Sequence, residues 1–152
     1  MSERSISIPP TVYKALEEEA KRRDTVPEAV VLQVLLRVVP EDERSRAMVE
    51  AARILLRHAD EHASTGDFET AFKRLWVASL VALDAAAASR GEEQPRELAD
   101  YWRLTSSLGG DDVLNGWYAG LAAYLASKEG VGDEGHYKAI RERIEKMVEA
   151  IL

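Results

Sequence analysis

The chain has 152 residues, of which 46% are hydrophobic, and a formal net charge of −7. This length suits one compact domain with a sizeable apolar core. Because the sequence contains no cysteine, disulfides, thiolate metal sites and cysteine nucleophiles are excluded. The longest apolar run, about Val77 to Ala88, is interrupted by Asp84 and is too short to cross a bilayer. We therefore expect a cytoplasmic protein without a membrane segment.

The N-terminal part, residues 1–39, predicts a short extended segment followed by two helices. Residues 5–8 alternate polar and apolar side chains, and a pair of prolines then favours a helix start, with the first helix expected over 10–23. A capping-box spacing that ends at Glu28 predicts a second helix over 26–39. This part carries six acidic and six basic side chains, so it is neutral and the charge excess lies beyond it.

The second part, residues 40–152, predicts a helical bundle. The helix expected over 67–90 becomes apolar almost all round after Leu75, and such a helix must be surrounded by others. Asp84 within it predicts a paired buried carboxylate, not a catalytic base. The further helices of this part are expected to begin near Pro40, Pro95 and Asp112 and after the glycine-rich loop that ends at Gly135. The predicted fold class is an all-α bundle around a buried central helix.

Two glycines predict a close contact within this bundle. Gly116 and Gly120 lie one helical turn apart, so a helix that carries them can approach a neighbour closely. The aromatic pair Trp117 and Tyr118 between them is expected to anchor the core or an interface.

Two histidines form the most chemically suggestive motif. His58 and His62 lie one helical turn apart, and Glu61 completes H-x-x-E-H, the string of inverted zinc peptidases. Such a metal site needs a third protein ligand and a cleft for the substrate. Because the only other histidine, His136, lies beside a loop, a solvated helix end explains the motif more simply. We therefore predict neither a metal nor another cofactor. If a metal did bind, His58 and His62 would be its candidate ligands.

The same segment contains R-x-x-x-x-H, from Arg57 to His62, which resembles the ribonuclease signature of HEPN toxins. In that chemistry the histidine would transfer protons and the arginine would stabilise developing charge. The motif normally lies late in the HEPN bundle, whereas here it precedes the central helix. Hydrolytic catalysis is therefore not expected, and the candidate residues for it are Arg57, Glu61 and His62.

The N-terminal order of extended segment, helix, turn and helix resembles a ribbon-helix-helix module, in which two chains pair their strands and place them in the DNA major groove. The resemblance implies that Ile6 and Ile8 face inward and that Glu3, Ser5 and Ser7 face the DNA. A glutamate and two serines are poor partners for phosphate or guanine. We therefore expect this part to mediate dimerisation or to cover the bundle.

The segment from Gly66 to Ala78 resembles a known family. Gly66-Asp67-Phe68, Ala71 and Lys73-Arg74-Leu75-Trp76-Val77-Ala78 are similar to the G-D-Y-x-x-A-x-E-K-L-W-G-A pattern of the PaREP family of archaeal helical proteins, itself similar to HEPN-superfamily bundles. The resemblance implies a helical bundle, an archaeal source and a partner such as a nucleotidyltransferase-like protein. Scarce asparagine and glutamine fit a thermophile. The family also has an H-x-N-F-Y-E string in a later helix. In this chain its histidine, asparagine and glutamate are replaced by Leu114, Gly116 and Ala119.

Together these patterns predict a non-enzymatic homodimer that acts as a protein-interaction or scaffolding module. The neutral N-terminal part and the acidic remainder lack the basic surface of a strong nucleic-acid binder. Two alternatives stay open: a ribbon-helix-helix-type DNA-binding regulator, and a HEPN-type ribonuclease that uses Arg57 and His62.

Overall fold

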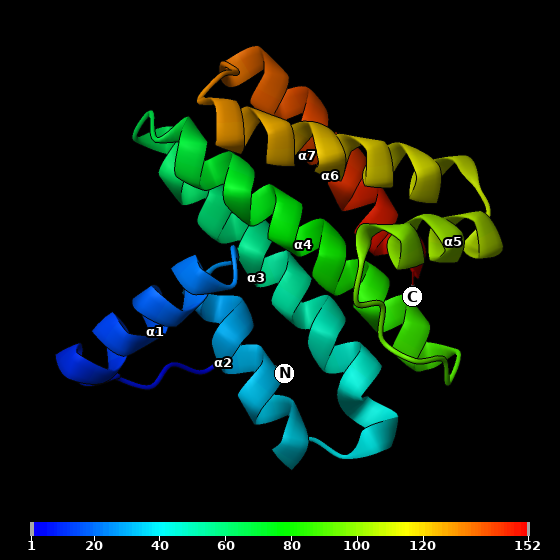
Figure 1. Ribbon diagram of the computed structural model, residues 1–152, viewed down its shortest axis with the longest axis horizontal. Coiled ribbons are helices and arrows are strands. Elements are labelled where there is room, and N and C mark those ends of the chain that lie inside the picture. The colour runs from blue at the N-terminus through cyan, green and yellow to red at the C-terminus, as the bar shows by residue number, and fades with distance from the viewer. Residues whose placement is uncertain (1, 152) are drawn as a thin grey trace.

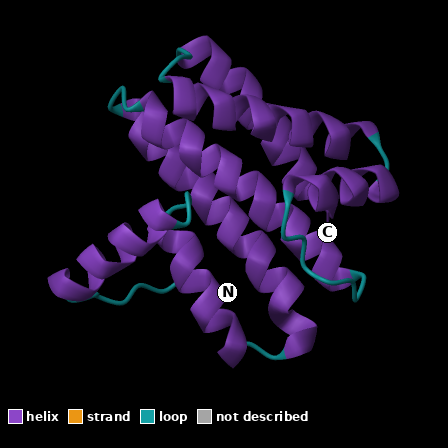
Figure 2. Ribbon diagram, in the orientation of Figure 1, coloured by secondary structure: helices purple, strands orange, loops and turns teal. Residues whose placement is uncertain are grey.

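The computed structural model describes residues 2–151, and this part of the chain consists of helices and loops without a strand (Figure 2). The predicted all-α architecture is confirmed. The helices are α1 (Pro10–Arg22), α2 (Pro27–Leu35), α3 (Arg44–Ser64), α4 (Phe68–Ser89), α5 (Leu98–Leu108), α6 (Asp111–Glu129) and α7 (Glu134–Ile151), with two short 3-10 helices, η1 (Leu36–Val38) and η2 (Glu41–Glu43), between α2 and α3.

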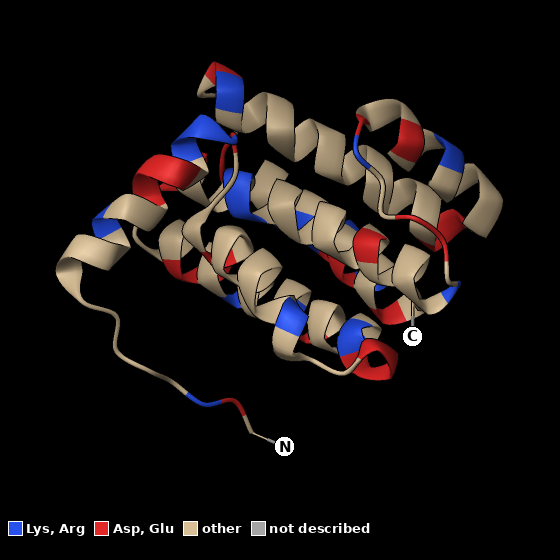
Figure 3. Cartoon of the chain, turned by 60° about the horizontal axis from the view of Figure 1, so that its bottom comes forward, with Lys and Arg blue, Asp and Glu red and all other residues tan. Residues whose placement is uncertain are grey.

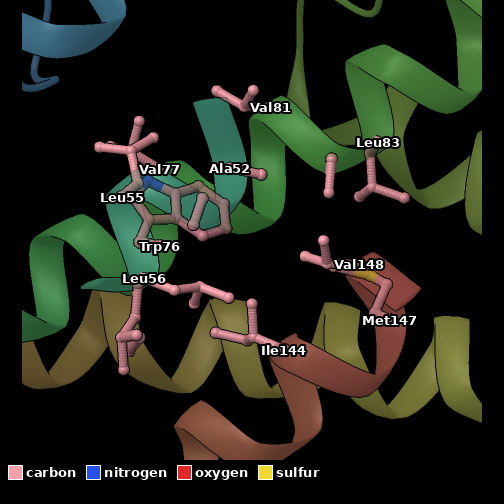
Figure 4. Close-up of a cluster of buried hydrophobic side chains, with 14 of the residues drawn as sticks. Ala52, Leu55, Leu56, Trp76, Val77, Val81, Leu83, Ile144, Met147 and Val148 are labelled. Carbon is pink, nitrogen blue, oxygen red and sulfur yellow. The ribbon is translucent and has the colours of Figure 1, made fainter. Parts of the chain in front are cut away.

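Helix α4 lies at the centre of the bundle and contacts α3, α5, α6 and α7 (Figure 1). Its side chains are buried on several sides, as the apolar pattern after Leu75 predicts. Figure 4 shows part of the core, where Leu55 of α3, Val77 of α4 and Ile144 of α7 belong to one apolar cluster. The central position of this helix is therefore confirmed.

The turn into α4 follows from two residues. Gly66 has a φ of +82°, a left-handed conformation that glycine adopts without steric cost. The side chain of Asp67 then accepts a hydrogen bond of 3.2 Å from the backbone N–H of Thr70, which caps the first turn of α4. The chain thereby reverses so that α3 and α4 lie side by side (Figure 1).

Helix α6 approaches its neighbours closely at its two glycines. A Cβ atom on Gly116 would lie 2.8 Å from Sδ of Met147 and closer still to that residue's Cβ, and a Cβ on Gly120 would lie 2.9 Å from Cβ of Ser79. The predicted close approach is confirmed. Of the expected anchors, Trp117 is fully buried, whereas Tyr118 is half exposed.

Helices α1 and α2 form a pair at one side of the bundle, with α2 next to α3 (Figure 1). Residues 2–9 before α1 are neither helix nor strand. The second helix was predicted over 26–39, but α2 ends at Leu35 and the 3-10 helix η1 follows it. The helical path stops at Val39, which is extended (φ −89°, ψ 130°). A residue before a proline is driven out of the helical region, and Pro40 follows here.

The expected capping box is wrong. Helix α2 begins after Val26, and no side chain caps it. The carboxylate of Glu28 instead bonds to residues of α3 and α4.

None of the helices between residues 2 and 151 combines the length and the apolar composition that a bilayer span requires.

Candidate functional site

The candidate site is a groove between the N-terminal helices and α3, with a cavity volume of about 520 Å³. We call it the N-terminal groove. Its walls are apolar, and its one polar end collects charged and histidine side chains. The apolar lining includes Ile8, Tyr13, Leu16, Val31, Leu35 and Ile54; the polar lining is Glu28, His58, Glu61, His62 and Arg74.

Three residues from three helices meet at the polar end. His58 Nδ1 lies 2.9 Å from Oε2 of Glu28. Arg74 donates from Nε to the same oxygen at 3.0 Å and from Nη2 to the other carboxylate oxygen at 3.3 Å. Because Glu28 belongs to α2, His58 to α3 and Arg74 to α4, this cluster fastens the N-terminal helices to the bundle.

The cluster holds Glu28 in its charged form. Burial by itself raises the pKa of Glu28, but the hydrogen bond with His58 and the charge of Arg74 together outweigh it, so the net pKa lies below the ordinary value of 4.5. Glu28 is therefore ionised at neutral pH. The Arg74 side chain is only 12% exposed, and its charge is compensated by this one carboxylate.

The other sequence candidates bond to different partners. Arg57 donates to both carboxylate oxygens of Glu3, at 2.6 and 2.9 Å, and so connects the N-terminal segment to α3. His62 Nδ1 lies 3.4 Å from Oδ2 of Asp67, at the turn into α4. Residues five apart on a helix point about 140° apart, which explains why Arg57 and His62 have separate surroundings. Glu61 is exposed on the groove rim.

The two candidate metal ligands, His58 and His62, each lie next to a carboxylate. His58 uses Nδ1 for Glu28, and His62 uses Nδ1 for Asp67. Among residues 2–151, no group of three or more His, Asp or Glu side chains is placed to hold a metal ion.

Sequence reasoning missed Glu28 and Arg74 as members of this site. Glu28 lies at a capping position next to a helix start. That local pattern predicted a helix cap and gave no indication of the bonds from Glu28 to His58 and Arg74. Arg74 gave a usable signal, because it is a charged residue within a helix that is otherwise largely apolar. A buried position for such a residue requires an acidic partner.

Replacing Glu28 with Ala should lower the free energy of unfolding by about 1.5 kcal/mol at pH 7, because it leaves the largely buried Arg74 charge without its partner. The lowered pKa of Glu28 means that the carboxylate stabilises the fold above its unfolded pKa. This stabilisation is lost as the pH falls through the lower folded value, so the difference should shrink in acid.

Urea unfolding followed by circular dichroism measures this difference. Glu61→Ala is the matched control, since it removes an exposed glutamate from the same groove, and it should change stability by about 0.5 kcal/mol or less. Equal effects of the two substitutions would show that the cluster at Glu28 does not stabilise the fold.

Comparison with models of known protein families, with curated proteins and with solved structures finds no match.

Proposed function

We propose that the protein is a homodimeric protein-interaction module whose dimer interface is formed by α1, α2 and the N-terminal segment. The observation that carries the proposal is the outer face of α2. A helix in a small bundle usually shows one apolar face to its neighbours and a polar face to water. Helix α2 has apolar residues on both of these faces.

The inner face of α2 is used within the chain. Val30 is buried, and Ala29 and Leu32 pack against the core. On the outer side and just beyond the helix, Val34 is 61% exposed and Val38 is 79% exposed. Leu35 is half exposed beside them. Exposed apolar side chains that cluster in this way mark interaction surfaces.

Helix α1 and the segment before it extend the same apolar surface. Val12 and Tyr13 are half exposed on α1, and Ile6 is 83% exposed in the preceding segment. A second molecule that packs on α1 would bury these residues, since α1 packs on α2 and projects from the bundle (Figure 1).

Charge favours a second copy of this chain as the occupant. Residues 17–19 of α1 are acidic and residues 21–23 at its end are basic (Figure 3), and Glu19 bonds to Arg22 and Arg23, so these charges compensate one another within the chain. The N-terminal part is neutral, whereas the chain carries −7 overall. Association through this part keeps the two acidic bundles apart.

The Val34→Glu variant should convert the dimer into a monomer. It places a charge from each copy in the apolar interface and should weaken self-association at least about 100-fold. Sedimentation velocity across the micromolar range measures the change. Leu125→Glu is the control, because Leu125 is equally exposed on α6 and lies away from the proposed interface. A wild-type protein that stays monomeric, or an equal effect of both variants, would contradict the proposal.

A DNA-binding regulator of the ribbon-helix-helix type is the second candidate. The favouring observation is the non-helical segment 2–9 ahead of the α1–α2 pair, since strands of that type form only when two copies pair. The acidic charge of the whole chain weighs against it. Submicromolar, sequence-dependent DNA binding at physiological salt would place this candidate first.

A further inference from the structure

A second hollow, of about 750 Å³, lies between α2, α4 and the chain that connects α4 to α5. We call it the α4–α5 pocket. It opens on the other side of α2 from Val34 and Leu35, so it is separate from the proposed dimer interface. Its walls include apolar side chains from α2, η1, α3 and α4, namely Leu32, Leu36, Met48, Leu80 and Val81.

Asp84 is the one ionisable residue that α4 contributes to the lining of this pocket. Tyr101 donates its hydroxyl to Oδ1 of Asp84 at 2.8 Å, and Gln94 donates from Nε2 to Oδ2 at 3.3 Å. Each carboxylate oxygen can accept two hydrogen bonds, so acceptor capacity remains on both. Within residues 2–151, no lysine, arginine or histidine forms an ion pair with Asp84. The predicted buried carboxylate therefore has neutral partners and lacks a counterion.

The lack of a counterion affects the protonation of Asp84. Burial raises its pKa from 3.8 to about 7, and the hydrogen bonds from Tyr101 and Gln94 lower it only in part. Once ionised, a largely buried carboxylate is a favourable site for a cation, because the attraction between the two charges is strong where solvent is scarce.

The remaining charged groups around the pocket leave it acidic. Arg23, from the end of α1, is held by Glu19 at 2.6 Å and by Gln33 at 2.9 Å. Arg96 in the connecting chain lies on the rim together with Glu93 and Glu97. The two rim glutamates offset Arg96, and α2, α3 and α5 add no further cation to the lining.

We infer that the α4–α5 pocket binds a small organic cation, a protonated amine carried on an apolar body. The ammonium group would donate to the free lone pairs of Asp84. The apolar body would cover Leu36, Met48 and Leu80. Burial of the apolar body contributes to the binding affinity, and the ion pair with Asp84 makes the pocket prefer a cation over an uncharged molecule of the same shape.

The probes are 2-phenylethylamine and tryptamine, each compared with the alcohol that replaces its ammonium group by a hydroxyl. Isothermal titration calorimetry on the full chain should show each amine binding at least about tenfold more tightly than its alcohol at pH 8. Because Asp84 must lose its proton to bind the cation, amine affinity should rise about tenfold from pH 6 to pH 8, whereas alcohol affinity should stay constant.

Asp84→Asn should abolish the preference for amine over alcohol, since asparagine keeps an acceptor for Tyr101 but has no charge. Glu93→Gln is the matched control, because it removes one rim charge and leaves Asp84 in place; it should change amine affinity by about twofold or less. Amines that fail to bind at millimolar concentration, or that bind equally well to the Asp84→Asn protein, would overturn the inference.

Discussion

The Asp84→Asn variant is expected to be more stable than the wild-type protein by about 3 kcal/mol at pH 8 and equally stable near pH 4. In the folded chain burial raises the pKa of Asp84 to about 7, compared with 3.8 for the free side chain. The folded state therefore holds this proton more tightly than the unfolded state does. As the pH rises between these two values, the wild-type protein loses stability because its buried carboxyl ionises without a counterion.

Asparagine has no proton to lose, so the difference between the two proteins should grow from about pH 4 and level off above about pH 7. Guanidinium unfolding at several pH values measures it. Other carboxylates act in the opposite direction, since the pKa values of Asp24 and Glu28 are lowered. For that reason the difference between variant and wild type is the useful quantity, not the wild-type curve alone.

Glu93→Gln serves as the control on the rim of the same pocket, and its stability relative to wild type should vary little with pH. A difference for Asp84→Asn that stays constant between pH 4 and pH 8 would show that Asp84 titrates normally. Lower stability of this variant at pH 8 would show that an ionised Asp84 is a favourable part of the fold.

Gly116→Ala is expected to lower the free energy of unfolding by about 2 kcal/mol. The added Cβ would lie 2.8 Å from Sδ and 3.0 Å from Cγ of Met147, and nearest of all to its Cβ. Because that Cβ is attached directly to the backbone, α7 must shift, and overpacking of this kind costs about 3 kcal/mol. Alanine recovers about 1 kcal/mol through its higher helix propensity.

Gly135→Ala is the matched control for this substitution. Gly135 lies in the first turn of α7, and a Cβ there would come no closer than 3.4 Å to its neighbours, at Oδ1 of Asp133. It should leave stability unchanged or raise it by up to about 1 kcal/mol. Thermal and urea unfolding of both variants measure the effects. A Gly116→Ala protein as stable as the control would mean that α6 and α7 separate without cost.

Much of the fold can be predicted from local patterns. The run of apolar residues after Leu75 indicates a surrounded helix, and the Gly66-Asp67 pair indicates the turn that precedes it, because both signals depend only on residues near each other in the chain. The close approach at Gly116 was also predicted, since a glycine pair one turn apart has few other uses in a helix. Which helix it meets was not predictable, because Met147 lies far along the sequence.

The candidate sites depend on tertiary contacts. Local spacing assigned Glu28 to a helix cap, but its carboxylate bonds to His58, 30 residues away, and to Arg74, 46 residues away. A buried arginine gains more from an ionised partner than a helix end gains from a cap, because water can satisfy the exposed end. Likewise, the sequence predicted a partner for Asp84. Only the tertiary structure determines that these partners are the uncharged Tyr101 and Gln94, because the connection after α4 and the start of α5 place these two side chains, and no cation, within hydrogen-bonding distance of the carboxylate.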